Sequence, residues 1–317
     1  MQLCLMVETE DDVTWPQWAR LAEGCERYGL HGLFGADHYG SVYERRDQGS
    51  LDVWTVLAAL ATRTRRIRLG TLVSPVTFRH PSVLAKVVTT VDHVSGGRVE
   101  LGLGAGRYEP EHRAYGFRYP PVGERLGMLA EYLRVIHAQW TEENVTFHGE
   151  HFLLEGCVAR FRPLQQPHPP LIVGGGGGPR SIGIAARWAD EYNVAGLSPE
   201  ECRKTRQRLT EASERHGRDP RTLRLSYLGA CLAGADGPEL RRRVWHVLER
   251  TGQWGTSVDE FLDRMGPDWI AGTVDRVMGR LDALRDAGVH RVYLRHPLPD
   301  DLDMVELIGR VVVPAMA

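Results

Sequence analysis

A run of five glycines, Gly174 to Gly178, is the strongest chemical signal in the sequence. The apolar stretch 171–173 precedes it, and the stretch 179–181, Pro-Arg-Ser, opens an amphipathic helix directly behind it. Bare backbone amides, a helix N-terminus and a cation in one place are what a phosphate group requires. The alternative is a loop that uses glycine only for turning, but five in a row exceed what a turn needs. The run therefore predicts an anion site.

Asp37 and His38 follow a short apolar run, and a carboxylate beside an imidazole can serve in general acid/base catalysis. Because the chain has 13 histidines, the pair alone does not separate a catalytic role from a structural one. As metal ligands the two residues lack companions, since the first strand carries no His-x-His. We therefore predict no metal site.

A second glycine cluster, Gly102-Leu103-Gly104-Ala105-Gly106, resembles a dinucleotide fingerprint but fails its spacing. The third glycine of G-x-G-x-x-G falls at Arg107, and no acidic strand end follows about 20 residues on. These glycines instead suit the close approach of a flat ligand to the backbone. Acyl transfer is disfavoured too, because no G-x-S-x-G elbow occurs and Ser74 has no neighbouring base.

Charge and cysteine content exclude several classes of protein. With 39 Lys and Arg against 41 Asp and Glu, no net field attracts nucleic acid or an anionic membrane. The five cysteines are an odd number without a Cys-x-x-Cys pair, which fits a reducing compartment. Acidic residues directly follow the first apolar run, 3–7, which is unlike a signal peptide. No apolar run reaches the roughly 18 residues that a membrane span needs. We expect a cytoplasmic protein acting on a small molecule.

The elements that must position these residues are short apolar runs alternating with helical patterns, which is typical of βα units around a parallel sheet. Eight such units favour an α/β fold of the (β/α)8 TIM-barrel type, with one domain over residues 1–317. In such barrels, catalytic groups lie where strands end. The expected strands are Leu3–Val7, Gly32–Ala36, Ile67–Val73, Val99–Leu103, Leu171–Gly174, Glu191–Ala195, Leu223–Leu228 and Val292–Arg295.

Two stretches interrupt the alternation and predict insertions before strand five and between strands seven and eight. Residues 146–162 have the pattern of a hairpin that turns near Gly149. Residues 236–272 combine a cationic amphipathic helix with a glycine- and tryptophan-rich piece, and we expect its aromatic residues to close over a substrate. Those aromatic residues are Trp254, Phe261 and Trp269.

Several segments in order resemble the bacterial luciferase-like flavin and deazaflavin oxidoreductase superfamily, in particular its coenzyme F420-dependent branch. The segments are GLHGLFGADHYG, RIRLGTLVSPVTFRHPSVLAKVVTTVDHVSGGRVELGLGAGRYEPEHRAYG and PHPPLIVGGGGGPRSIGIAARWADEYNV. The match runs from Leu3 to about Arg295 and is more specific than any one motif. It implies a barrel with insertions, in agreement with the eight units, and a homodimer.

The resemblance also implies a role for each predicted site residue. Asp37 and His38 would lie at the reactive ring carbon, with His38 in proton transfer or in stabilising a substrate anion. The third strand would back the ring with a bulge and a non-prolyl cis peptide, whose position the sequence leaves open. The expected cofactor contacts are Thr71, Leu72, Val73 and Ser74 at the ring, Gly104, Ala105, Gly106 and Arg107 along the ribityl chain, and Gly175, Gly176, Gly177, Arg180 and Ser181 at the phosphate.

The sequence departs from relatives with defined substrates at two positions. Some family members place a Trp four residues after the His and a catalytic Glu directly after the strand-four glycines, where this chain has Val42 and Arg107. Glu109 and Glu111 are nearby acids that fit loop charges equally well. We therefore expect an F420-dependent oxidoreductase of unassigned substrate. The alternatives are an FMN-dependent monooxygenase that uses dioxygen and a flavin-binding protein without catalysis.

Overall fold

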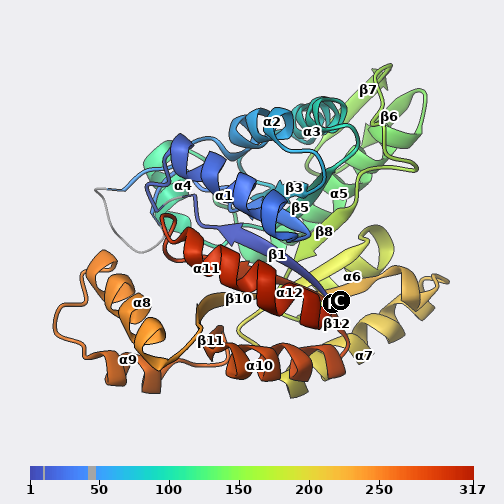
Figure 1. Ribbon diagram of the computed structural model, residues 1–317. Coiled ribbons are helices and arrows are strands. Elements are labelled where there is room, and N and C mark those ends of the chain that lie inside the picture. The colour runs from blue at the N-terminus through green and yellow to red at the C-terminus, as the bar shows by residue number, and fades with distance from the viewer. Residues whose placement is uncertain (10, 42–47) are drawn as a thin grey trace.

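Eight parallel strands close into a barrel surrounded by helices in the computed structural model, which describes residues 1–9, 11–41 and 48–317 (Figure 1). Each strand pairs with the next around the ring, and β12 returns to β1. The predicted TIM-barrel fold is confirmed. The barrel strands are β1 (Gln2–Val7), β2 (Gly32–Gly35), β3 (Arg68–Thr71), β5 (Val99–Gly104), β8 (Leu171–Gly174), β9 (Glu191–Ala195), β10 (Arg224–Gly234) and β12 (Val289–Arg295).

The helices cover the outside of the barrel with their apolar faces, as in α1, whose Trp18, Leu21 and Cys25 are buried. Local signals set their ends: Ser198 and Glu201 form a reciprocal capping box at the start of α7. The helices are α1 (Trp15–Tyr28), α2 (Val53–Arg63), α3 (Pro81–Ser95), α4 (Glu109–Tyr115), α5 (Val122–Thr141), α6 (Pro179–Trp188), α7 (Pro199–Arg215), α8 (Gly237–Arg250), α9 (Val258–Arg264), α10 (Val274–Asp286), α11 (Leu302–Leu307) and α12 (Val313–Met316).

Two layers of side chains fill the barrel. At the N-terminal end of the strands, Arg291 lies between Glu100 and Glu191, 2.6 Å and 3.4 Å away. Above this ionic layer lies an apolar one that includes Phe34 and Tyr293, whose ring centroids are 4.9 Å apart. The interior is therefore packed, and only the C-terminal ends of the strands face the mouth.

The third strand is interrupted, which the sequence pattern did not predict. β3 ends at Thr71, and the chain resumes pairing as β4 (Ser74–Pro75) against β5. The connecting Leu72–Val73 peptide bond is cis, within the stretch where the family resemblance implied such a bond. The apolar residues of the run 67–73 by themselves predict one strand, because such a pattern does not distinguish a continuous strand from one with a bulge.

The first insertion is the predicted hairpin. β6 (Val145–His148) and β7 (Leu153–Cys157) pair antiparallel, and the turn lies at residues 149–152. The hairpin packs its apolar side on α5, where Val145 and Leu154 contact Val135 and Ala138.

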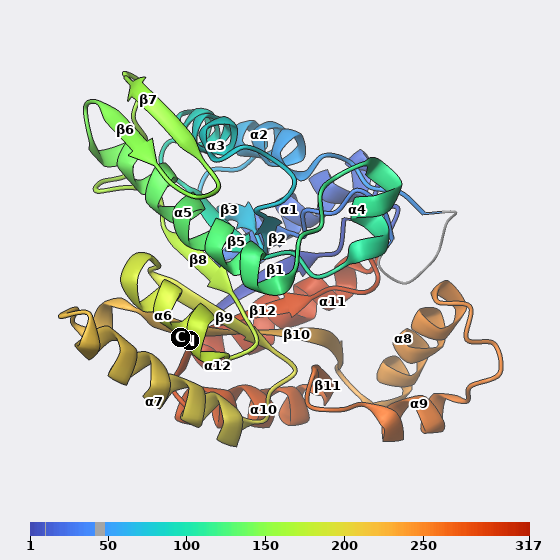
Figure 2. The ribbon, with the colours of Figure 1, turned by 180° about the vertical axis from the view of Figure 1, so that it is seen from behind.

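The second insertion contains α8, α9 and an additional strand, β11 (Trp269–Thr273), which pairs parallel with β10 outside the barrel. Figures 1 and 2 show α8 and α9 standing off from the ring of helices. Phe261 and Trp269 contact each other, with ring centroids 5.4 Å apart, while Trp254 is 73% exposed. Two of the three aromatic residues expected over a substrate thus hold α9 on β11. No helix in the described ranges is long and apolar enough to cross a membrane.

Candidate active site

The predicted site residues on three strands meet at the side chain of Val73. A Cβ atom added at Gly104 would lie 2.7 Å from Val73 Cγ2, and one added at Gly174 would lie 3.1 Å from Val73 Cγ1. Real Cβ contacts are essentially never as short as the first distance and are rarely as short as the second, so glycine at both positions leaves room for the Val73 side chain. The bulge after β3, the end of β5 and the end of β8 therefore form one continuous surface at the barrel mouth.

His38 lies beside this mouth at the end of β2, and its imidazole is held by a carboxylate from another segment. His38 Nδ1 is 2.9 Å from Glu111 Oε2, on a side chain that is 1% exposed. The other carboxylate oxygen, Oε1, accepts from the backbone amides of Tyr39 and Gly40. Burial raises the pKa of Glu111, but these hydrogen bonds, first of all that with His38, lower it below its usual value.

Aromatic contacts hold the short helix α4, and with it Glu111, against the end of β2. The Tyr39 ring lies 5.2 Å from Tyr115 and 5.0 Å from Phe117, and the Tyr115 hydroxyl donates to the Tyr39 carbonyl at 2.8 Å. His112 lies on the same helix and is hydrogen-bonded to Thr77, with 2.6 Å between Nε2 and Oγ1. The Glu111–His38 contact thus rests on a docked helix rather than on a loop.

Asp37 enters a different network from His38. Its Oδ2 accepts from Ser74 Oγ at 2.6 Å and from Arg79 Nη1 at 2.5 Å, and Ser74 Oγ in turn accepts from Trp54 Nε1 at 3.0 Å. Burial raises the pKa of Asp37, although Arg79 and Ser74 oppose the shift. We therefore correct the expected pairing: Asp37 anchors the segment after the β3 bulge, and Glu111 is the carboxylate that contacts the imidazole.

Two glycines of the run have a local structural reason for their type. A Cβ atom at Gly175 would lie 2.4 Å from Tyr192 Oη, and Gly177 has a left-handed φ of +78°. A Cβ atom at Gly176 would meet nothing within 4 Å, and one at Gly178 would meet only Ser181 Oγ at 4.0 Å. Packing within the protein therefore does not explain why positions 176 and 178 are glycine.

Several backbone amides at this loop are open. Within the described part of the chain, the amides of Gly176 and Gly178 have no hydrogen-bond acceptor, and Gly178 caps α6 without a side chain. The amides of Arg180 and Ser181, in the first turn of α6, are likewise without a partner there. A phosphate group matches this arrangement of donors, so the loop fits the phosphate of the expected cofactor.

The side chains predicted for the phosphate are engaged elsewhere. Arg180 Nη1 donates to the carbonyl of Gly123 on α5 at 2.7 Å, and Ser181 Oγ donates to the Gly178 carbonyl and bonds with Tyr192 Oη. Of the stretch after β5, Gly106 has a left-handed φ of +80°, Ala105 is half-buried and Arg107 is exposed. Val42, the position of the family's Trp, lies outside the described residues.

Sequence reasoning gave no role to Arg79 and Trp54, and it named Glu111 only as a nearby acid that could equally be a loop charge. Glu111 lies 73 positions from its partner His38, so no local spacing could connect the two. The available signal was the seven-residue α4 pattern that ends in Gly116, because a helix at that point gives its acidic residues fixed directions.

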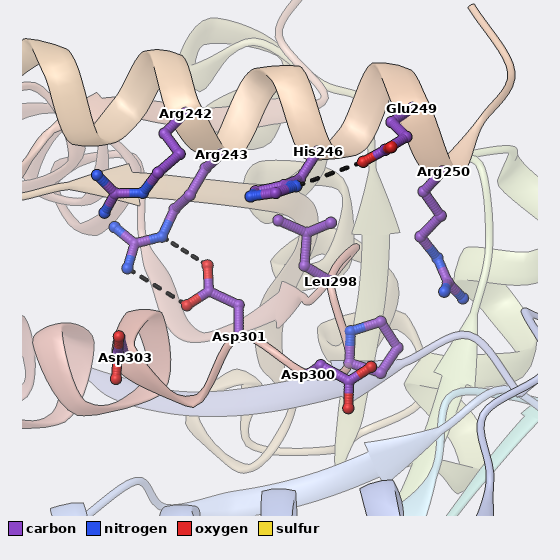
Figure 3. A pocket seen from close by; sticks show the side chains of 10 residues that line it. Arg242, Arg243, His246, Glu249, Arg250, Leu298, Asp300, Asp301 and Asp303 are labelled. Carbon is purple, nitrogen blue, oxygen red and sulfur yellow. Dashed lines mark hydrogen bonds and ion pairs between the residues drawn. The ribbon is translucent and has the colours of Figure 1, made fainter.

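A separate pocket of about 430 Å³ lies between α8 and the segment 298–303 (Figure 3). Its lining includes none of the predicted site residues. Arg243 is bound there to Asp301 by two contacts, of 2.6 Å and 3.3 Å, and cations and carboxylates face each other across the space. Nothing in this charge pattern selects one class of ligand.

The chain belongs to the luciferase-like monooxygenase family, whose model matches residues 4–291. The barrel fold described above agrees with this family.

Individual relatives of this family differ in their cofactor. The chain is 28% identical to an F420-dependent glucose-6-phosphate dehydrogenase of Amycolatopsis mediterranei over 92% of each chain. It is 25% identical to an FMNH2-dependent dimethylsulfone monooxygenase of Pseudomonas putida over 93% of this chain and 86% of that one. The crystal structure of the monooxygenase RslO1 from Streptomyces bottropensis superposes with a TM-score of 0.85 at 24% identity, over the full length of both chains. The first curated relatives are matched over only 49% to 52% of their length.

Proposed function

We propose that the protein is a coenzyme F420-dependent oxidoreductase that transfers a hydride between the deazaflavin and a small organic substrate in the cytoplasm. The observation that carries the proposal is the placement of the His38 imidazole, hydrogen-bonded to Glu111, at the mouth of the barrel where the Val73 surface lies. The F420-dependent relative, matched over 92% of both chains, supports the choice of cofactor.

The residues of the mouth fit such a cofactor in three parts. The open amides of the loop 176–181 would hold the phosphate, and the bare backbone of Gly104 to Gly106 would lie along the ribityl chain. Leu72 and Val73 would back the ring, which supplies a carbon atom able to give or take a hydride. A flat ligand can approach the backbone closely here because the strand ends carry glycine.

His38 is the proton-transfer group in this proposal. Its Nδ1 is held by Glu111, so Nε2 is the nitrogen that exchanges a proton with a substrate hydroxyl or carbonyl. Asp37 keeps the bulge in place through Ser74, and the Asp37 carboxylate is itself fixed by Arg79. Hydride transfer and proton transfer would thus be served by two networks that share the end of β2.

A second candidate function is an FMN-dependent monooxygenase, and the 25% identical dimethylsulfone monooxygenase favours it over a similar length. The same phosphate loop would suit either cofactor, because both carry a phosphate and they differ in the ring. Reduced flavin activates dioxygen, whereas a deazaflavin reacts poorly with it.

Binding titrations of the purified protein with F420 and with FMN test the proposal. We expect tight binding of F420 and substrate turnover without uptake of oxygen. Turnover under labelled dioxygen is the second measurement. If the protein binds FMN, ignores F420 and transfers a labelled oxygen atom into the product, the monooxygenase function is correct instead.

A further inference from the structure

Glu111 is fixed more firmly than its contact with His38 requires. One carboxylate oxygen accepts two backbone amides, from Tyr39 and Gly40, and the other faces His38 Nδ1 at 2.9 Å. The residue is 4% exposed, and its helix is docked by the Tyr39, Tyr115 and Phe117 rings. The carboxylate therefore has one orientation, and that orientation presents an acceptor to a single imidazole nitrogen.

We propose that Glu111 is a positioning residue that holds His38 in the tautomer protonated on Nδ1 and stabilises its imidazolium form. The inference rests on the proposed function insofar as His38 transfers a proton to or from the substrate. A carboxylate oxygen can only accept, so the proton on this hydrogen bond belongs to the imidazole. The attraction between the ionised carboxylate and the imidazolium favours the charged form of His38.

In the described part of the chain, the charged groups on the segments next to His38 have partners of their own. On the same loop, Asp37 is bound to Arg79, which comes from the segment after β4 and also binds Asp52 at the start of α2. Tyr39 is neutral at pH 7, because the ordinary pKa of a phenol is about 10 and burial raises it further. Among these groups Glu111 is the carboxylate in direct contact with the imidazole, so its removal changes the charge that His38 meets.

The variant Glu111→Gln isolates this effect, because the side chain keeps its size. The two backbone amides require an oxygen at the Oε1 position, so the new amide group faces His38 as a donor. The imidazole must then accept on Nδ1 and carry its proton on Nε2. The matched control is Glu109→Gln on the same helix, whose carboxylate is 55% exposed and bound to Arg113.

NMR titration of the imidazole, assigned by comparison with His38→Gln, measures the result without any cofactor. We expect Glu111→Gln to lower the pKa of His38 by about 1 to 2 units and to move the neutral proton from Nδ1 to Nε2. Glu109→Gln should leave both unchanged. An unaltered titration and tautomer in a folded Glu111→Gln protein would overturn the proposal.

Two further measurements keep the inference separate from the proposed function. If Glu111→Gln does not fold, the tautomer of the native protein decides: a neutral His38 protonated on Nδ1 supports the proposal, and one protonated on Nε2 contradicts it. With cofactor and substrate, the pH profile of kcat should shift to lower pH in Glu111→Gln by the same number of units. Unchanged turnover in His38→Ala would refute the catalytic role of His38. The NMR titration and the tautomer would still test whether Glu111 positions the imidazole.

Discussion

Asp37 and His38 are adjacent in the chain, but their side chains perform different physical tasks. Asp37 is 2% exposed, and its carboxylate accepts hydrogen bonds from the Arg79 guanidinium and the Ser74 hydroxyl. Its role is therefore to fix these two side chains. His38 is 13% exposed, and among the described residues its imidazole contacts Glu111 and not the Asp37 network. Consecutive residues at a strand end point in different directions, which is why one residue can belong to the scaffold and its neighbour to the site.

At this scale we predict that His38→Ala reduces turnover by about 100 to 10,000-fold and leaves cofactor affinity within about twofold, because a general acid/base acts on the reacting centre and not on cofactor binding. Steady-state kinetics and cofactor titration measure the two quantities. His148→Ala, which removes a 63% exposed imidazole on the β6–β7 hairpin, is the control and should change neither. Equal loss of affinity and turnover would show that His38 acts in cofactor binding.

The sequence could predict His38 but not its partner. A strand followed by Asp-His marks the C-terminal end of β2, and strand ends in a barrel meet at the mouth. The contact with Glu111, by contrast, depends on how α4 docks through ring contacts among residues 39, 78, 115 and 117. Such contacts join segments far apart in the chain, and a single sequence holds no record of them.

At the scale of elements, the glycines at the ends of β5 and β8 and in the loop after β8 have different surroundings. Gly104 must be bare because of Val73, whereas Gly176 faces open space. The amino-acid pattern marked both as glycine-rich without separating them. Packing against the protein itself and approach of a ligand are therefore two distinct reasons for the same residue type.

We predict that Gly104→Ala lowers the free energy of unfolding by about 1 to 3 kcal/mol, because its Cβ atom would lie 2.7 Å from Val73 Cγ2. Gly176→Ala should change stability by no more than about 0.5 kcal/mol. Adding Val73→Ala to Gly104→Ala removes the clashing methyl group and should recover part of the loss as a coupling energy. Urea denaturation of the variants measures these values. If the two substitutions change the free energy of unfolding additively, the side chain at position 73 does not clash with the Cβ atom at position 104.

The boundaries of the strands show where the pattern of apolar residues reaches its limit. The barrel strands were found, but β10 continues to Gly234, six residues beyond the expected end at Leu228, because β11 lies along that extension. The partner strand Trp269–Thr273 is short and contains glycine, so the pattern of apolar residues does not separate it from the loop around it. Its pairing with β10, a distant segment, makes it a strand.

At the scale of the whole molecule, the ionic layer in the barrel floor joins opposite sides of the ring. Arg291 on β12 binds Glu100 on β5, and these strands lie four places apart in the ring of eight. Glu100 is also bound by Arg68 at 2.7 Å. Burial raises the pKa of Glu100, but the two guanidinium groups outweigh it and lower the pKa to about 2.

Glu100→Gln should lower the free energy of unfolding by about 3 kcal/mol or more at pH 7, because it leaves the buried Arg291 and the half-buried Arg68 undercompensated. A carboxyl group with a lowered pKa stabilises the fold above its ordinary value of 4.5, and the contribution is lost as pH falls toward about 2. The difference between the two proteins should therefore narrow below pH 4.5.

Urea unfolding at pH 7 and pH 3 measures this difference. The control is Glu143→Gln at an exposed position, which should not alter the pH dependence. A gap between Glu100→Gln and the native protein that stays constant with pH would show that the charge of Glu100 does not stabilise the barrel.

The contact of Val73 with Gly104 and Gly174 has a consequence for redesign. These three positions lie on three segments, yet neither glycine can become larger unless the side chain at position 73 becomes smaller. A library that varies position 73 toward larger residues has no space to fill, since the glycines are already as small as a residue can be. Grafting a pocket from another family member onto this barrel therefore requires transferring the three positions together.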